Sequence, residues 1–432
     1  MHKIVLAYYG DDFTGSTDAL EFISNAGAKA MLFIDPPEKD ILEKYPDLDV
    51  YGVAGKTRAL PASEVYATVL EAFKKMQTTG AKHIHYKVCS TFDSSPTIGS
   101  IGKVIDAGDE VFNNRIIPVI GGAPALGRYC VFGNLFARMG IGSKGEIYRL
   151  DRHPSMSRHP VTPATESDLR LHLSKQTEIS FGLINFVQQQ QSVEEWERLV
   201  EDNKAVLIDA IDNAQLIKIG AWLEALAHKQ TPLFTVGPSS VEMALGNYWI
   251  QENKLKPFTS GHTVGASNQL LVISGSCSSV TTKQLQFAKA NGFEEVIIEA
   301  SKVCDNQPDA NIEHTLNSLL SQGKNVILHT GLKEEKNLSS EKLGTYLGTL
   351  AKNAVSKYSL SRLGVAGGDT SSYAARAMGI EAVEMIASSG IGAPLCRVFS
   401  KEKEINGLEI NFKGGQVGAD DFFTKLLKGN FN

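Results

Sequence analysis

Two adjacent carboxylates stand directly after an apolar run near the start of the chain, in the sequence VLAYYGDDFTGSTD at residues 5–18. Adjacent acids at the end of a predicted strand suit a general base, a polyol-binding group or the ligand shell of a magnesium ion. Asp12 is the first candidate for the base and Asp11 the second. One alternative stays open, because either acid, or Thr14, could simply cap the helix that follows.

A second polar cluster follows another apolar run and reads YKVCSTFDSSPTIG, at residues 86–99. A lysine followed by many hydroxyls suits an oxygen-rich anion, because Lys supplies charge and Ser and Thr match hydroxyl groups. A solvated loop would have a similar composition. The candidate binding residues in this cluster are Lys87, Ser90, Thr91 and Asp93.

Further candidates occur where other predicted strands end. Arg58 lies in KTRAL, and Gly122 and Arg128 follow the apolar run IIPVI. The segment DRHPSMSRHPVTP, at residues 151–163, adds basic side chains that could meet a carboxylate or a phosphate. Each signal is weak alone, but the shared position after strands favours a single pocket.

Three glycine-rich turns in the second half resemble phosphate-binding turns. The sequences VISGSCSS at 272–279 and VAGGDTSS at 365–372 each join a predicted strand to a predicted helix, and KGGQVG at 413–418 supplies a third turn. Backbone N–H groups at such helix starts bind phosphate. One such turn is often only geometric, but three in one domain favour a nucleotide. The predicted contacts are Ser274, Ser276, Gly367, Gly368, Asp369, Thr370 and Gly415.

Two motifs that look like nucleotide signatures are rejected. GIGSKG at 140–145 matches GxGxxG, but it follows a predicted helix, NLFARM, and precedes an extended segment, which reverses the required order. GKT at 55–57 lacks the first glycine of a P-loop because position 50 is Val. The sequence therefore predicts neither a dinucleotide fingerprint nor a Walker A loop.

Short β-rich runs alternate with amphipathic segments along most of the chain. This pattern predicts an α/β protein with two domains, each built on a mainly parallel sheet flanked by helices. The turn-rich segment at 255–267 shows little periodicity and marks the boundary. The predicted domains are residues 1–255 and 256–432.

Composition narrows the partners. The 432 residues carry a net charge of -5, which gives no reason to expect nucleic acid or a membrane surface. The 5 cysteines are scattered and form no CxxC pair, which indicates a reducing cytoplasm rather than a disulfide framework or a zinc site. No signal peptide and no membrane-spanning helix are expected. A small-molecule ligand is favoured, and a homo-oligomer is left open.

In order and spacing, the motifs resemble the four-carbon acid sugar kinase family over essentially the whole chain. The segments that carry the resemblance are GDDFTGSTDAL, KTRAL, YKVCST, GGAPA, HPVTPATESDL, LVISGSCS, VAGGDTS and KGGQVG. The resemblance implies a kinase that uses ATP and Mg²⁺, with an acid-sugar domain, a nucleotide domain and an active site in the cleft between them. Asp11, Asp12 and nearby hydroxyls would then bind and activate the acid sugar, and the three glycine turns would bind ATP.

One motif departs from the family pattern. Members usually carry Lys-x-Asp-Ser-Thr-Leu-Arg-Gly-Asn in the second cluster, whereas here Cys89 replaces the Asp and Asp93 replaces the Arg. An acid at that place would repel a substrate carboxylate, so Lys87, Arg58 and Arg128 become the candidate cations. The chain is more similar to a subgroup that acts on 3-oxo-isoapionate. A kinase for D-threonate or D-erythronate and a non-catalytic nucleotide or sugar sensor remain alternatives.

Overall fold

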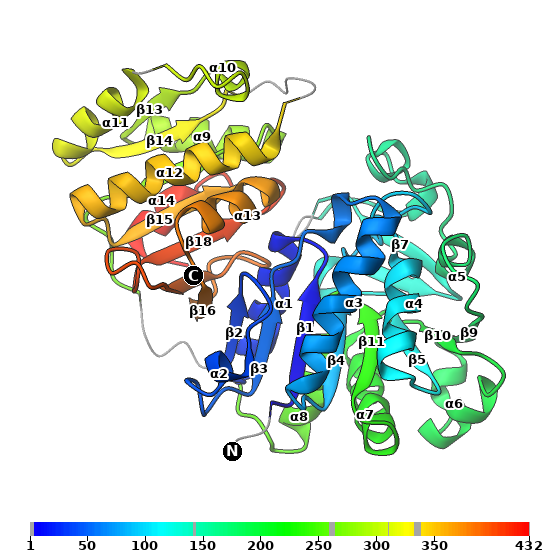
Figure 1. The fold of residues 1–432 in the computed structure, drawn as a ribbon. Coiled ribbons are helices and arrows are strands. Elements are labelled where there is room, and N and C mark those ends of the chain that lie inside the picture. The colour runs from blue at the N-terminus through cyan, green and yellow to red at the C-terminus, as the bar shows by residue number, and fades with distance from the viewer. Residues whose placement is uncertain (1–3, 141–143, 259–263, 310, 332–337, 432) are drawn as a thin grey trace. The chain divides into compact units, whose positions relative to one another are not determined.

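The computed structural model describes residues 4–140, 144–258, 264–309, 311–331 and 338–431 (Figure 1). The chain divides into two compact units. The first comprises Met1–Ala30 with Asp35–Phe258, and the second comprises Met31–Ile34 with Thr259–Asn432. Strands and helices alternate through both units, which confirms the predicted α/β class.

The first unit is built on a parallel sheet with the strand order β3-β1-β4-β11-β5-β10-β9. Its strands are buried on both faces, as their continuous apolar runs predict, except that the edge strand β9 is half-buried on one face. They are β1 (Leu6–Gly10), β3 (Val50–Val53), β4 (His83–Lys87), β5 (Ile117–Ile120), β9 (Phe181–Ile184), β10 (Ala205–Ile208) and β11 (Leu233–Gly237).

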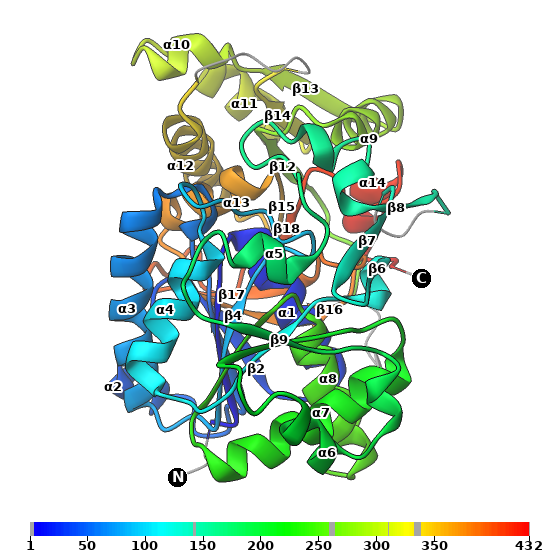
Figure 2. The same ribbon diagram turned by 90° about the vertical axis from the view of Figure 1, so that its right-hand side faces the viewer.

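Helices cover both faces of this sheet. Two of them pack together on one face, and three lie on the other, as Figure 2 shows edge-on. The first pair is α3 (Ala62–Thr78) and α4 (Ile101–Phe112), and the second set is α1 (Phe13–Asn25), α7 (Asn213–Lys229) and α8 (Ser240–Gln251). Shorter helices are α2 (Lys39–Leu42), α5 (Leu169–Leu173) and α6 (Val193–Leu199).

A small antiparallel sheet in the first unit corrects one prediction. It consists of β6 (Arg128–Val131), β7 (Asn134–Arg138) and β8 (Ile147–Arg149). The segment NLFARM was predicted as a helix, but it forms β7, because buried Leu135 and Ala137 alternate with half-buried neighbours. The rejection of GIGSKG holds, since the next element is the strand β8 rather than a helix; residues 141–143 of that motif lie outside the described residues.

The second unit starts as a parallel sheet with the order β13-β14-β12-β15-β18 and continues with the antiparallel strands β17, β16 and β2. The antiparallel part was not expected. It arises because short loops join β16 to β17 and β17 to β18, and neither is long enough for a crossover helix. The strands are β2 (Ala30–Phe33), β12 (Leu271–Ser274), β13 (Phe293–Ile297), β14 (Asn325–His329), β15 (Arg362–Ala366), β16 (Ala382–Ala387), β17 (Leu395–Phe399) and β18 (Glu409–Lys413).

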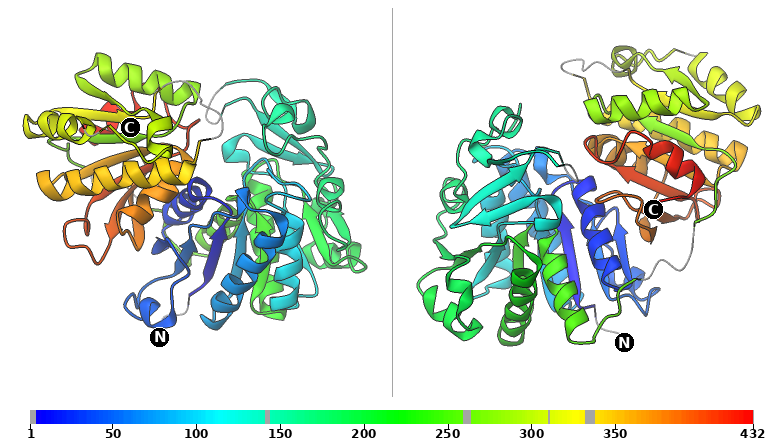
Figure 3. Two further views of the ribbon diagram at one scale, coloured as in Figure 1. Left: turned by 45° about the horizontal axis from the view of Figure 1, so that its top comes forward. Right: turned by 180° about the vertical axis from the view of Figure 1, so that it is seen from behind.

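Helices also cover both faces of the second sheet. Figure 1 shows α12 (Ser340–Tyr358) and α13 (Gly368–Ala377) on one face, and the reverse view in Figure 3 shows α9 (Ser279–Ala290) and α14 (Phe422–Lys428) on the other. The remaining helices are α10 (Ala300–Cys304) and α11 (Asn311–Ser321). In the described part of the chain, no helix is both long enough and apolar enough to cross a bilayer.

Each parallel sheet contains a point where the strand order reverses. In the first unit, β1 lies between β3 and β4, and in the second, β12 lies between β14 and β15. Loops that leave neighbouring strands in opposite directions open a crevice at the carboxyl ends, where ligands of open α/β sheets bind. The predicted clusters follow β1 and β4 in one unit, and β12, β15 and β18 in the other.

Candidate active site

One arginine binds both acids that follow β1. Arg58 lies in a 3₁₀ turn after β3, and its Nε and Nη2 donate to the two carboxylate oxygens of Asp11 at 3.0 and 2.8 Å. Its Nη1 donates to Asp12 Oδ2 at 2.9 Å, and its Nη2 lies 2.8 Å from Asp12 Oδ1. The guanidinium is therefore shared between two carboxylates, and its charge is already compensated.

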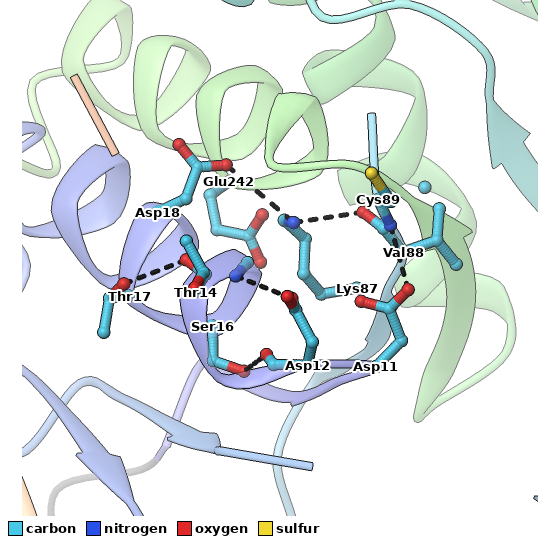
Figure 4. Close-up of polar contacts among 12 residues, drawn as sticks. Asp11, Asp12, Thr14, Ser16, Thr17, Asp18, Lys87, Val88, Cys89 and Glu242 are labelled. Atoms are coloured by element: carbon cyan, nitrogen blue, oxygen red, sulfur yellow. Dashed lines mark hydrogen bonds and ion pairs between the residues drawn. The ribbon is translucent and has the colours of Figure 1, made fainter. Parts of the chain in front are cut away.

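The two acids differ in how much of each a ligand could reach. The Asp11 side chain is 4% exposed and also accepts from the backbone N–H of Cys89 at 3.1 Å. Asp12 is 23% exposed, and its Oδ1 accepts from Gly15 N at 2.7 Å, so it caps α1 from an extended conformation (Figure 4). Burial raises the pKa of Asp12, and Arg58 opposes that shift. The capping interpretation is thus correct for Asp12, and the same carboxylate is the more accessible of the two.

Lys87 is buried beneath the first turn of α1. It is 2% exposed, and its Nζ donates to the Val88 carbonyl at 3.0 Å and lies 3.8 Å from Asp18 Oδ2 (Figure 4). A Cβ on Gly15 would come within 2.8 Å of that Nζ and 2.6 Å of Asp12 Oδ1, so a larger residue there would require these two side chains to shift. Lys87 therefore packs under the segment that carries Asp11 and Asp12 and helps to hold it in place.

The loop after β4 holds Asp93 in place. Thr91 Oγ1 donates to Asp93 Oδ1 at 2.8 Å and lies 3.1 Å from the sulfur of Cys89. Burial, with Asp93 adding to it, raises the pKa of the Cys89 thiol to about 11, so the thiol is neutral. Phe92 adopts a left-handed φ of 53°, which turns the loop sharply. Ser90 is buried in the same loop.

Arg128 begins β6 and is 8% exposed. Its Nη1 donates to the carbonyls of Leu126 at 2.7 Å and Arg138 at 3.3 Å, and its Nε is buried without a hydrogen-bond partner. Burial lowers the pKa of Arg128, while Cys89 and Asp93 act in the opposite direction. Among the described residues, no carboxylate forms an ion pair with it.

The three glycine turns of the second unit converge. A Cβ on Gly275 would come within 2.5 Å of Thr370 Oγ1, and one on Gly415 within 2.8 Å of Ser276 Oγ. Gly367 has a φ of 117°, which L residues with side chains rarely adopt. The turns after β12, β15 and β18 therefore form one backbone surface at the start of α9 and α13, which is the kind of surface at which proteins bind phosphates.

The sequence models of known domains match both units. The model of a sugar-binding N-terminal domain matches residues 6–245, and that of a nucleotide-binding C-terminal domain matches residues 271–423. The chain belongs to the four-carbon acid sugar kinase family.

Two named relatives in this family match the chain over nearly its whole length. A 3-oxo-isoapionate kinase from Paraburkholderia graminis is 36% identical over 99% of this chain and 94% of its own. A 3-oxo-tetronate kinase from Pseudomonas savastanoi pv. phaseolicola is 28% identical over 98% of this chain and 97% of its own.

Solved structures share the fold. A crystal structure from Salmonella typhimurium LT2 matches with a TM-score of 0.77 at 21% identity and covers 98% of both chains. One from Haemophilus influenzae matches with a TM-score of 0.69 at 20% identity and covers 99% of this chain and 100% of its own.

In this member of the family, several predicted residues have structural roles. A Cβ on Gly122 would come within 2.2 Å of the Ala210 carbonyl, so backbone packing explains that glycine. Ser274 is buried and accepts from Ser276 N at 3.2 Å, which shapes its turn. Thr370 is buried, whereas Asp369 is exposed in the first turn of α13, next to Gly368.

Sequence reasoning missed the charged groups that lie deepest. His85 Nδ1 lies 2.6 Å from Glu242 Oε1, and Asp18 lies beside Lys87. A usable signal existed: His85 and Lys87 stand two residues apart in a strand, so they share a face, and a polar pair facing a core needs buried partners. Lys413 was quoted only as the start of a turn, yet it is fully buried.

A separate cavity lies at the end of the first sheet opposite to the predicted site residues. Its volume is about 390 Å³, and it is lined mainly by apolar groups, among them Ile4, Leu42, Tyr45 and Leu48. These residues precede strands or belong to α2, so the cavity lies at the amino ends. It contains none of the predicted site residues and is not the candidate active site.

Proposed function

We propose that this chain transfers the γ-phosphoryl group of ATP to a hydroxyl of a small branched or keto acid sugar of the 3-oxo-isoapionate type. In this proposal the first unit binds the acid sugar and the second binds the nucleotide. The matched domain models and the named kinase relatives support it. A kinase for an unbranched four-carbon acid is the second candidate: the 28% identical relative is named a 3-oxo-tetronate kinase, and D-threonate and D-erythronate are the alternative substrates expected from the family resemblance.

The observation that carries the substrate proposal is the charge balance of the three predicted cations. Arg58 is shared by two acids, and Lys87 is buried 3.8 Å from Asp18. Arg128 has no acid partner among the described residues and a buried Nε without a hydrogen-bond partner. A substrate carboxylate would supply the acid partner that Arg128 lacks. Asp93, which stands where the family usually has Arg, would accept from a hydroxyl of a branched acid.

The transfer step needs a base and a positioned donor. Asp12 would accept the proton of the attacking hydroxyl while that oxygen bonds to the γ-phosphorus, and the bond from this phosphorus to the bridging oxygen of ADP breaks. Asp11 would keep Arg58 in place and thereby hold Asp12. The hydroxyls of Ser90 and Thr91 would contact the acid sugar.

The nucleotide would lie on the three glycine turns. Backbone N–H groups near Ser276, Gly368 and Gly415 would bind its phosphates. Mg²⁺ would arrive bound to ATP and neutralise charge on the phosphates. Within the described residues, no cluster of three His, Cys, Asp or Glu side chains offers a protein metal site.

The test measures ADP release from ATP and Mg²⁺ with 3-oxo-isoapionate, 3-oxo-tetronate, D-threonate and D-erythronate. We expect the branched keto acid to show the highest kcat/KM. Equal or faster turnover of D-threonate would contradict the substrate proposal. Nucleotide binding without ADP release for any acceptor would favour the sensor alternative.

A further inference from the structure

Lys413, the last residue of β18, is a fully buried lysine with an incompletely compensated amine. Its exposed fraction is 0%. Its Nζ donates to Thr281 Oγ1 at 3.1 Å and lies 5.9 Å from the ring centres of Phe422 and of Phe423. An ammonium has three donors and is costly to bury unless it is paired. Among the described residues, no carboxylate forms an ion pair with Lys413.

Lys413 connects all three glycine turns. Its backbone carbonyl accepts from Gly367 N at 2.9 Å. Thr281, which binds the amine, donates in turn to the Gly415 carbonyl at 3.0 Å. Ser278 at the start of α9 also donates to that carbonyl. The amine is therefore two hydrogen bonds away from the surface proposed to bind phosphates.

No charged side chain around β18 accounts for the state of this amine. Burial is the resolved cause that lowers the pKa of Lys413, to about 7. Lys425 pairs with Asp421 at 3.3 Å. Glu409, which lies on β18 with Lys413, pairs with Arg362 on β15. The charged residues on the elements packed around Lys413 are Lys283 and Lys289 on α9, Asp369 and Arg376 on α13, Asp421, Lys425 and Lys428 at α14, Arg362 on β15, Arg397 on β17 and Glu409 on β18.

We propose that Lys413 takes up one proton from solvent when nucleotide phosphates bind to the three turns, so that nucleotide affinity depends on pH. This inference rests on the nucleotide role proposed for the second unit. A nearby anion favours the ammonium form. The free protein holds the amine mostly neutral above neutral pH, and the complex holds it charged, with the bound phosphates as counter-charge.

The experiment is titration calorimetry of ADP with Mg²⁺ at about pH 8, in two buffers of different ionisation enthalpy. For the wild type we expect roughly half a proton or more to be taken up per bound ADP, and affinity to fall about tenfold between about pH 6 and about pH 9. Lys413→Met should bind more weakly, without that proton uptake and with little pH dependence. Lys425→Met, at a partly exposed lysine paired with Asp421, is the matched control and should keep the uptake.

The possible outcomes separate the two proposals. Wild-type binding with no proton uptake at about pH 8 overturns the inference alone, whatever the variants do. Equal proton uptake in wild type and Lys413→Met also overturns it, because another group would then be titrating. Failure of the wild type to bind ADP contradicts the nucleotide role itself.

Discussion

The two units place opposite kinds of chemistry at equivalent positions. At the reversal point of the first sheet, the proposed ligand-binding groups are charged side chains, among them Asp11 and Asp12, which share Arg58. At the reversal point of the second, they are the backbones of the glycine turns, and the nearby amine of Lys413 is buried. The same topology thus offers either specific side-chain contacts for a small acid or a backbone surface for phosphates.

This difference predicts which substrate each change affects. Side-chain changes in the first unit should alter chemistry and acid-sugar selectivity without changing nucleotide affinity. Side chains added in the glycine turns should change nucleotide affinity without altering acid-sugar selectivity. A first-unit change that alters nucleotide affinity, or a glycine-turn change that alters acid-sugar selectivity, would contradict this division of roles.

The largest effect is expected for Asp12→Asn. Loss of a positioned base should lower kcat by about 10²- to 10⁴-fold, with the KM for ATP nearly unchanged. Asn caps a helix about as well as Asp, so α1 should remain stable and the loss should not reflect unfolding. Steady-state kinetics with thermal unfolding as control checks this. A near-normal kcat would leave Asp12 as a cap only.

The next effect is expected for Arg128→Met. A hydrogen bond to a charged group contributes about 1.5 to 3 kcal/mol, so kcat/KM for the acid sugar should fall roughly ten- to a hundredfold. A neutral polyol in which the carboxylate is replaced by a hydroxymethyl group should lose little. Arg198→Met, at an exposed arginine beside Glu195, is the control. Equal losses on the acid and the neutral polyol would show that Arg128 is structural.

A change at Asp93 tests the same acid-sugar selectivity by adding a cation instead of removing one. Asp93→Arg restores the residue usual in the family and should favour D-threonate over the branched keto acid by roughly tenfold or more. Competition between the two substrates, measured for wild type and variant, gives that ratio directly. Unchanged selectivity would remove Asp93 from the specificity argument.

The glycine turns should respond through the nucleotide. Gly415→Val places atoms where even a Cβ would lie 2.8 Å from Ser276 Oγ, so the serines of the neighbouring turn must move and the added side chain occupies the proposed phosphate surface; the KM for ATP should rise about tenfold. The KM for the acid sugar should stay constant. Gly265→Ala is the control, because a Cβ there meets nothing within 4 Å. A rise in the acid-sugar KM alone would reverse the proposed roles of the units.

Local sequence patterns predicted the clusters but not their connections. Apolar runs followed by polar residues identify strand ends, which is why Asp12, Asp93 and the glycine turns could be selected. The bond from Arg58 to Asp11 spans separate strands, so it depends on strand order, which no local pattern contains. The β7 error has a different cause, since a short apolar segment fits helix and strand periods alike.

The smallest effect concerns stability and isolates the buried charge of the second unit. The pKa of Lys413 is about 7 when folded and returns to about 10.5 when unfolded, so the unfolded chain binds more protons between these values. The burial cost is therefore complete below about pH 7 and declines as pH rises toward about 10.5. Lys413→Met removes this cost and should raise Tm by several degrees at about pH 6, with the gain shrinking toward about pH 10. Thermal unfolding across that range measures it. A variant that is less stable at about pH 6 would mean that the amine is well compensated when charged, and the contrast between paired charges in the first unit and an uncompensated amine under the glycine turns would fail.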